Sequence, residues 1–130
     1  MKYLLITLVA VIAVCCACKA QKKYGKVVAV KEYAAAISAD TTGVLIDVRT
    51  PEEYAEGHLA GARLLNVLDK PAFEEAVKTL TAGPTYYIYC RSGRRSQTAA
   101  AIMESHGLQV VDLEGGYKAW TAAGMEVKKD

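Results

Sequence analysis

Net charge, cysteine and long apolar runs are all scarce in this sequence of 130 residues. Sixteen lysines and arginines are set against fourteen acidic residues, which leaves a formal net charge of +2. So small an excess argues against nucleic acid as the main partner. The 52% of hydrophobic and 23% of charged residues are typical of a globular protein rather than a disordered one, and the length suits a single domain.

The longest apolar run, from Tyr3 to Val14, is too short for a comfortable membrane span, which needs roughly 20 residues. It matches the hydrophobic region of a secretory signal instead. We therefore interpret residues 1–20 as a bacterial export signal. Residues 21–26 are polar and basic and are expected to form a tether to a folded domain over residues 27–130.

The end of this signal carries cysteines that indicate how it is processed. Ala17 directly precedes Cys18, as in a lipoprotein box, although Cys15 stands where leucine is usual. We interpret Cys18 as a lipidated residue that anchors an exported, periplasmic protein to a membrane. Cleavage after Ala20 by the ordinary signal peptidase is one alternative, and a retained N-terminal anchor helix is another.

Cysteine is almost absent from the rest of the chain. Three of the four cysteines lie at positions 15, 16 and 18, so Cys90 is the single thiol of the expected domain and has no partner for an internal disulfide. An unpaired thiol in an oxidising compartment is open to oxidation and mixed disulfides. Its retention there indicates that the thiol has a use.

Apolar runs alternate with amphipathic stretches along the domain. We expect strands over residues 27–30, 43–48, 62–67, 85–90 and 108–113, and helices over residues 31–40, 50–57, 70–80, 96–107 and 115–124. This alternation predicts an α/β fold of three layers, with a mostly parallel five-stranded sheet and helices on both of its faces.

The segment "YCRSGRRS" (89–96) places the thiol between the fourth strand and the helix that follows. Ligands of such sheets bind beyond the carboxyl ends of the strands, and loop N–H groups at a helix N-terminus attract anions. These surroundings lower a cysteine pKa from about 8.5 into the range of roughly 3.5–7.5. We interpret Cys90 as a nucleophile for a small oxyanion, held in a cradle of six residues: Arg91, Ser92, Gly93, Arg94, Arg95 and Ser96.

Attack on phosphorus and attack on sulfur both suit such a cradle. Cysteine phosphatases place a phosphate-clamping arginine six residues after the cysteine, where this chain has Ser96, and Arg95 comes one position early. The smaller cradle favours a sulfur atom attached to Cys90. An inert buried cysteine beside a solvated arginine cluster is disfavoured, because positive charge at a helix N-terminus needs compensation.

Two further motifs accompany the loop: "LIDVRTPEEYAEGHLAGARLLN" (45–66) and "LEGGYKAW" (113–120). In their order and spacing with "YCRSGRRS", the chain resembles a single-domain rhodanese over roughly residues 27–124. The resemblance implies a rhodanese-like fold and a sulfurtransferase activity. It implies transfer of a sulfane sulfur from thiosulfate or a similar donor to cyanide or a thiol acceptor.

The same resemblance assigns roles to single residues. Cys90 matches the cysteine that becomes a persulfide, and Asp47 and Arg49 match a pair that supports the loop region. No metal or organic cofactor is implied, and we expect a monomer. His58 invites interpretation as a general base, but ordering of the turn before the third strand is preferred.

Two other classes of protein remain open from the sequence. One is a small cysteine-dependent phosphatase or arsenate-reductase-like enzyme, which the short loop disfavours. The other is a non-catalytic module that uses the same fold to bind a partner, which the intact Cys90 disfavours.

Overall fold

The computed structural model describes residues 22–129. The expected export signal, including Cys18, lies outside the described residues. Along the described chain the strands and helices alternate: β1 (Lys26–Val28), α1 (Val30–Ala39), β2 (Val44–Asp47), α2 (Pro51–Glu56), β3 (Arg63–Leu64), α3 (Lys70–Lys78), β4 (Thr85–Tyr89), α4 (Arg94–Ser105), β5 (Gln109–Leu113) and α5 (Gly116–Ala122). In this part of the chain, no helix combines the length and the apolar character needed to cross a membrane.

The strands form one sheet in the order β1-β5-β4-β2-β3, and every neighbouring pair is parallel. The predicted α/β fold with a five-stranded sheet is confirmed, and the sheet is parallel throughout. Only the third strand is much shorter than expected, with two residues in place of 62–67. It is an edge strand, and β2, its single neighbour, already ends at Asp47.

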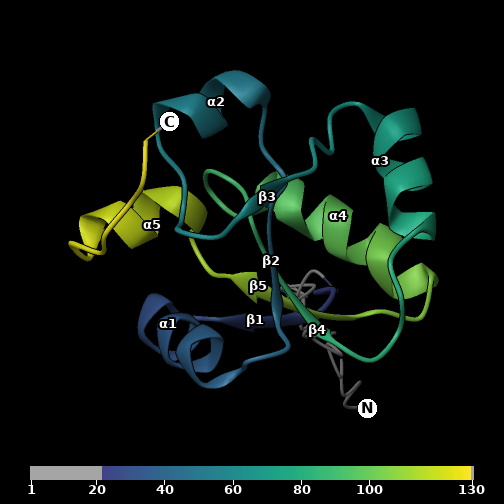
Figure 1. Cartoon of the computed structure of the whole chain (residues 1–130), viewed down its shortest axis with the longest axis horizontal. Coiled ribbons are helices and arrows are strands. Elements are labelled where there is room, and N and C mark those ends of the chain that lie inside the picture. The colour runs from purple at the N-terminus through teal and green to yellow at the C-terminus, as the bar shows by residue number, and fades with distance from the viewer. Residues whose placement is uncertain (1–21, 130) are drawn as a thin grey trace, which may run out of the picture.

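Helices cover both faces of the sheet, as Figure 1 shows, with α1 and α5 on one side and α3 and α4 on the other. The central strand β4 serves both layers by alternation. Tyr86 and Ile88 pack toward α3 and α4, whereas Tyr87 and Tyr89 pack toward α1 and α5. A central parallel strand must be apolar on both sides, which explains the unbroken run "TYYIY".

The N-terminal boundary of the folded body differs from the expected one. The backbone N–H of Tyr24 donates to Gln97 Oε1 over 2.8 Å, and Gln97 Nε2 donates back to the Tyr24 carbonyl over 2.9 Å. Gly25 N–H donates to a Glu104 carboxylate oxygen, and Lys26 already belongs to β1. The part of the expected tether from Tyr24 to Lys26 is therefore part of the domain, because side chains of α4 satisfy its backbone groups.

A buried ion pair joins several elements at the carboxyl end of the sheet. Asp47 and Arg49 are 0% and 3% exposed, and Arg49 Nη2 lies 2.7 Å from Asp47 Oδ2. Arg49 also donates to the Gly57 carbonyl over 2.6 Å, and its guanidinium lies 4.2 Å from the ring centre of Tyr117. The Tyr89 hydroxyl donates to Asp47 over 2.7 Å. The pair thus connects β2, the end of α2, β4 and α5.

His58 lies in the turn between α2 and β3. Its side chain is 5% exposed, and its ring stacks on Tyr54 with 3.8 Å between the ring centres. Its Nδ1 lies 2.9 Å from the Tyr54 carbonyl oxygen, and its backbone forms a two-way bridge with Lys128. These contacts hold the turn against α2 and the C-terminal segment.

A second ion pair connects α2 with α4. Thr50 and Glu53 form a capping box that begins α2, with Pro51 at the first helical position. Arg95 donates to both carboxylate oxygens of Glu53 over 2.6 and 2.8 Å. These hydrogen bonds lower the pKa of Glu53 from 4.5 to about 2. The first turn of α4 is thereby fixed to a helix that lies 42 residues earlier in the chain.

We expect Arg49→Ala to reduce the free energy of unfolding by about 3–5 kcal/mol, because it leaves the buried Asp47 charge without its cationic partner. Denaturation in urea measures this loss. Lys78→Ala is the matched control, because it removes an exposed ion pair with Glu75 and should change stability little. Equal losses in the two variants would contradict a dominant role for the buried pair.

The Glu53–Arg95 pair should stabilise the fold in a pH-dependent way. The pKa of Glu53 is depressed in the folded state, so the contribution is complete above pH 4.5 and is lost as the pH falls toward about 2. The difference in unfolding free energy between wild type and Glu53→Gln should therefore shrink across this window. Glu52→Gln, on the exposed side of the same helix, is the charge-matched control, and an equal pH dependence in both variants would exclude the pair as its source.

Candidate active site

The thiol of Cys90 lies at the carboxyl end of β4, directly after Tyr89. The residue is 1% exposed, and its Sγ accepts a hydrogen bond from Gly93 N–H over 3.0 Å. Gly93 has a φ of 100°, which turns the chain from the loop into α4. Helix α4 begins at Arg94, two residues earlier than expected. The sulfur therefore lies at the N-terminal, electropositive end of a twelve-residue helix.

The carbonyl groups of the loop are turned away from this sulfur toward α5. Tyr117 N–H donates to the Cys90 carbonyl over 2.8 Å, and Lys118 N–H donates to the Arg91 carbonyl over 3.0 Å. Both N–H groups belong to the first turn of α5, where a helix has no internal acceptors for them. With these carbonyls occupied elsewhere, the loop directs the Gly93 N–H at the thiol sulfur.

Gly116 makes this contact between the loop and α5 possible. It has a φ of 61°, and a Cβ at this position would lie 2.5 Å from the Cys90 carbonyl oxygen and 2.7 Å from the Arg91 carbonyl group. Only glycine fits so close to the loop backbone. The sequence signal for this residue is the glycine pair in "LEGGYKAW", to which our sequence analysis assigned no role.

The three arginines of the loop do not share one environment. Arg91 and Arg94 are exposed, and no carboxylate among residues 22–129 pairs with either. Arg95 is bound by Glu53, and its pKa is raised, first by that hydrogen bond and to a smaller extent by the charge of Cys90. At Arg95, the compensation that positive charge at a helix N-terminus needs comes from Glu53. Two cations remain available to an incoming anion.

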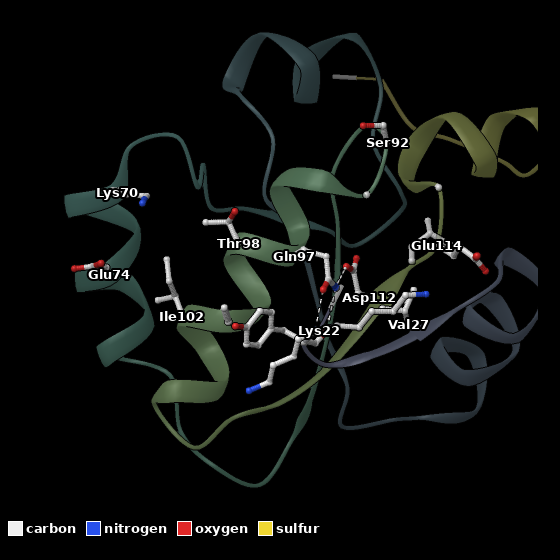
Figure 2. Close-up of a pocket in the computed structure, with 16 residues that line it drawn as sticks. Lys22, Val27, Lys70, Glu74, Ser92, Gln97, Thr98, Ile102, Asp112 and Glu114 are labelled. Carbon is white, nitrogen blue, oxygen red and sulfur yellow. Dashed lines mark hydrogen bonds between the residues drawn. The ribbon is translucent and has the colours of Figure 1, made fainter. Parts of the chain in front are cut away.

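Ser92 and Gly93 belong to the lining of a cavity of about 580 Å³. The cavity extends along α4 to the segment around Lys22. In Figure 2, Ser92 lies on the loop, apart from Gln97 and Asp112, whose side chains point toward one another. Its volume is within the range of small-molecule sites. Cys90 is not among its lining residues, so the cavity lies beside the thiol.

Ser96 lies beneath the thiol and away from solvent, although the sequence placed it among the substrate-binding residues. It is 0% exposed, and its Oγ accepts a hydrogen bond from the Cys90 thiol over 3.3 Å. Its hydroxyl donates to Asp112 Oδ2 over 3.0 Å, and Gln97 Nε2 donates to the same oxygen over 2.8 Å. Burial raises the pKa of Asp112 from 3.8 to about 6.

Sequence reasoning missed Asp112, because the segment "LQVVDL" (108–113) was interpreted only as a strand. An available signal was the acidic residue itself, since a carboxylate inside a buried strand is costly without partners. The structure thus brings Cys90, Ser96 and Asp112 together by hydrogen bonds. Three other residues of the predicted site are exposed to solvent: Arg91, Ser92 and Arg94.

Comparison with known proteins identifies relatives of this chain by sequence. Residues 29–123 match the model of the Rhodanese-like domain family. YtwF of Bacillus subtilis (strain 168), which is named as a sulfurtransferase, is 39% identical over 84 residues, covering 65% of this chain and 79% of YtwF. Thiosulfate sulfurtransferase GlpE of Ectopseudomonas mendocina (strain ymp) is 31% identical over 80 residues, covering 61% of this chain and 71% of that protein.

Solved structures agree with the sequence relatives. A rhodanese-related protein from Thermoplasma volcanium superposes with a TM-score of 0.71 at 26% identity, covering 81% of this chain and 99% of that chain. A rhodanese-like domain protein from Staphylococcus aureus gives a TM-score of 0.69 at 28% identity, covering 81% of this chain and 98% of that chain. By both its sequence and its fold, this protein belongs to the family of rhodanese-like domains.

Proposed function

We propose that this protein is a sulfurtransferase that carries a sulfane sulfur on Cys90. The observation that carries the proposal is the position of the thiol sulfur at the N-terminus of α4, with the Gly93 N–H directed at it over 3.0 Å. A helix N-terminus and a backbone donor both stabilise a sulfur anion. The sulfurtransferase names of relatives at 31–39% identity give independent support.

In the first step, the Cys90 thiolate attacks the outer sulfur of thiosulfate or a similar donor. A sulfur–sulfur bond to Cys90 forms, the sulfur–sulfur bond of the donor breaks, and sulfite leaves with the electron pair. The product is a Cys90 persulfide, whose negative charge the loop N–H groups and the pole of α4 stabilise. Arg91 and Arg94 attract the donor anion to the loop.

In the second step, cyanide or a thiolate acceptor attacks the outer sulfur of the persulfide. The bond to Cys90 breaks, the Cys90 thiolate is restored, and thiocyanate or an acceptor persulfide leaves. Atoms and charges balance over the two steps without an added oxidant or reductant. Thiosulfate as the donor, and export with a lipid anchor at Cys18, belong to this proposal on the basis of the sequence pattern alone.

Phosphoryl transfer has weaker support from the same loop. The position six residues after Cys90 is held by Ser96, which is fully buried. Arg95, the nearest arginine, has both of its terminal nitrogens bound to Glu53. A bidentate clamp on a phosphoryl group would need a guanidinium that is free to face the cysteine. A purely binding role would not require a thiol sulfur at the N-terminus of α4 with the Gly93 N–H directed at it.

Mass spectrometry of the purified full chain after incubation with thiosulfate tests the proposal. We expect Cys90 to gain one sulfur atom and to lose it when cyanide is added. Because Cys15, Cys16 and Cys18 are also present, the adduct is located by peptide mapping, and Cys18→Ser is the matched control that should keep full transfer. Sulfur transfer that persists in Cys90→Ser, or wild-type protein that takes up no sulfur but cleaves an aryl phosphate, would refute it.

Gly116→Ala should reduce the rate of thiocyanate formation by roughly 100-fold, because the new Cβ displaces the carbonyls of Cys90 and Arg91 and with them the loop. Gly61→Ala is the matched control. Gly61 also has a positive φ, 82°, so both variants have a similar backbone strain of about 1–2 kcal/mol, but nothing lies within 4 Å of the added Cβ at Gly61. Similar activities in the two variants would show that the loop tolerates the displacement.

A further inference from the structure

A chain of hydrogen bonds leads from the thiol into the interior of the protein. The Cys90 thiol donates to Ser96 Oγ over 3.3 Å, and the Ser96 hydroxyl donates to Asp112 Oδ2 over 3.0 Å. The three residues are 1%, 0% and 1% exposed. One hydroxyl group, shielded from solvent, therefore connects the reactive sulfur with a carboxyl group.

Asp112 differs from the other acidic residue buried at this end of the sheet. Asp47 has Arg49 as a buried cationic partner, whereas the side chains that donate to Asp112, those of Ser96 and Gln97, are both neutral. Its second oxygen, Oδ1, has no hydrogen-bond partner among residues 22–129. A buried carboxylate without a cation favours its protonated form, and burial raises the pKa of Asp112 to about 6 accordingly.

The single proton of the Ser96 hydroxyl limits which charge states this chain can satisfy. When Cys90 is a thiol and Asp112 is ionised, the thiol donates to Ser96 and Ser96 donates to the carboxylate. When Cys90 is a thiolate and Asp112 is protonated, the carboxyl group donates to Ser96 and Ser96 donates to the sulfur. When both are ionised, the two anions compete for one hydroxyl proton, and one of them loses the Ser96 hydroxyl as a donor, although the sulfur keeps the Gly93 N–H and Asp112 keeps Gln97.

We propose that Cys90 and Asp112 share one proton across Ser96, so that Asp112 is a positioning residue that sets the protonation state of the nucleophile. The proposal deepens the sulfurtransferase function and rests on it. In the exchange, the S–H bond of Cys90 breaks as its proton passes to Ser96 Oγ, and the hydroxyl proton of Ser96 passes to Asp112. The negative charge moves from Asp112 to the sulfur, and no electron is gained or lost.

Other ionisable groups surround this pair without entering the chain of hydrogen bonds. Arg95 on α4 acts on Cys90 by charge but is bound to Glu53, and Tyr33 on α1 donates its hydroxyl to the Ile88 carbonyl. Asp47 on β2 is bound to Arg49. Charged residues at the opening of the loop and along the adjoining cavity are Arg91, Arg94, Lys22, Lys23, Lys70, Glu74 and Glu114. Within the described residues, Asp112 is the carboxyl group linked to the thiol through a hydroxyl.

The test follows the rate of alkylation of Cys90 by iodoacetamide across pH, read by peptide mass spectrometry in the full chain. Two groups that share a proton titrate in two coupled steps, so wild type should show two ionisations. Asp112→Asn should lose one of them and show a single ionisation that lies between the two. Removal of the carboxylate also removes the charge that opposes full ionisation of the thiol, so the upper step should disappear.

Glu114→Gln is the charge-matched control, because it removes a carboxylate near the same strand but outside the chain of hydrogen bonds, and its profile should match wild type. A single ionisation in wild type would overturn the proposal even if Asp112→Asn does not fold, and two ionisations in Asp112→Asn would overturn it as well. Alkylation does not require sulfur transfer. Coupled ionisation in a protein that takes up no sulfur from thiosulfate would therefore refute the proposed function and leave the shared proton standing.

Discussion

The contact between the first turn of α5 and the carbonyl groups of the cysteine loop determines how the site is built. Two N–H groups that α5 cannot satisfy internally bind the carbonyls of Cys90 and Arg91. If these carbonyls were free, they could turn toward the sulfur and oppose its negative charge. Because they are held, the Gly93 N–H and the pole of α4 act on the sulfur together. The electrostatics of a loop after β4 thus depend on a helix at the other end of the sequence.

The acidic residues around the site are satisfied in three different ways. Asp47 is buried with Arg49, and Glu53 is half-buried with Arg95, so both have cations of their own. These two pairs occupy Arg49 and Arg95, and they leave Arg91 and Arg94 as the cations that face solvent at the loop. Asp112 has only neutral donors. Two ion pairs therefore hold elements of the fold together, whereas Arg91, Arg94 and Asp112, which have no ion-pair partner among the described residues, lie around the cysteine loop.

Sequence patterns predict the layers of this fold well because each depends on local composition. The run "TYYIY" is apolar on both faces, and it forms the central strand. Contacts between distant residues have no such local sign. The hydrogen bonds between Tyr24 and Gln97, 73 positions apart, place the start of the domain earlier than the sequence predicted. The ion pair of Glu53 and Arg95 shows that one arginine of the loop is already neutralised by the protein itself. Cys90 was identifiable from its neighbours in sequence, whereas the importance of Asp112 becomes visible only from its hydrogen bond with the Ser96 hydroxyl.

The buried Asp112 carboxylate affects stability in the opposite direction to Glu53, because its pKa is raised whereas that of Glu53 is lowered. Its pKa is raised from 3.8 to about 6, so the folded state binds a proton more tightly than the unfolded chain between these values. Stability therefore falls as the pH rises through this window, and above about pH 6 the ionised carboxylate weakens the fold. An asparagine would accept the same hydrogen bond from Ser96 without this cost. Residues that break a local rule at a cost to stability are expected where function requires them, and this one lies one hydroxyl away from the nucleophile.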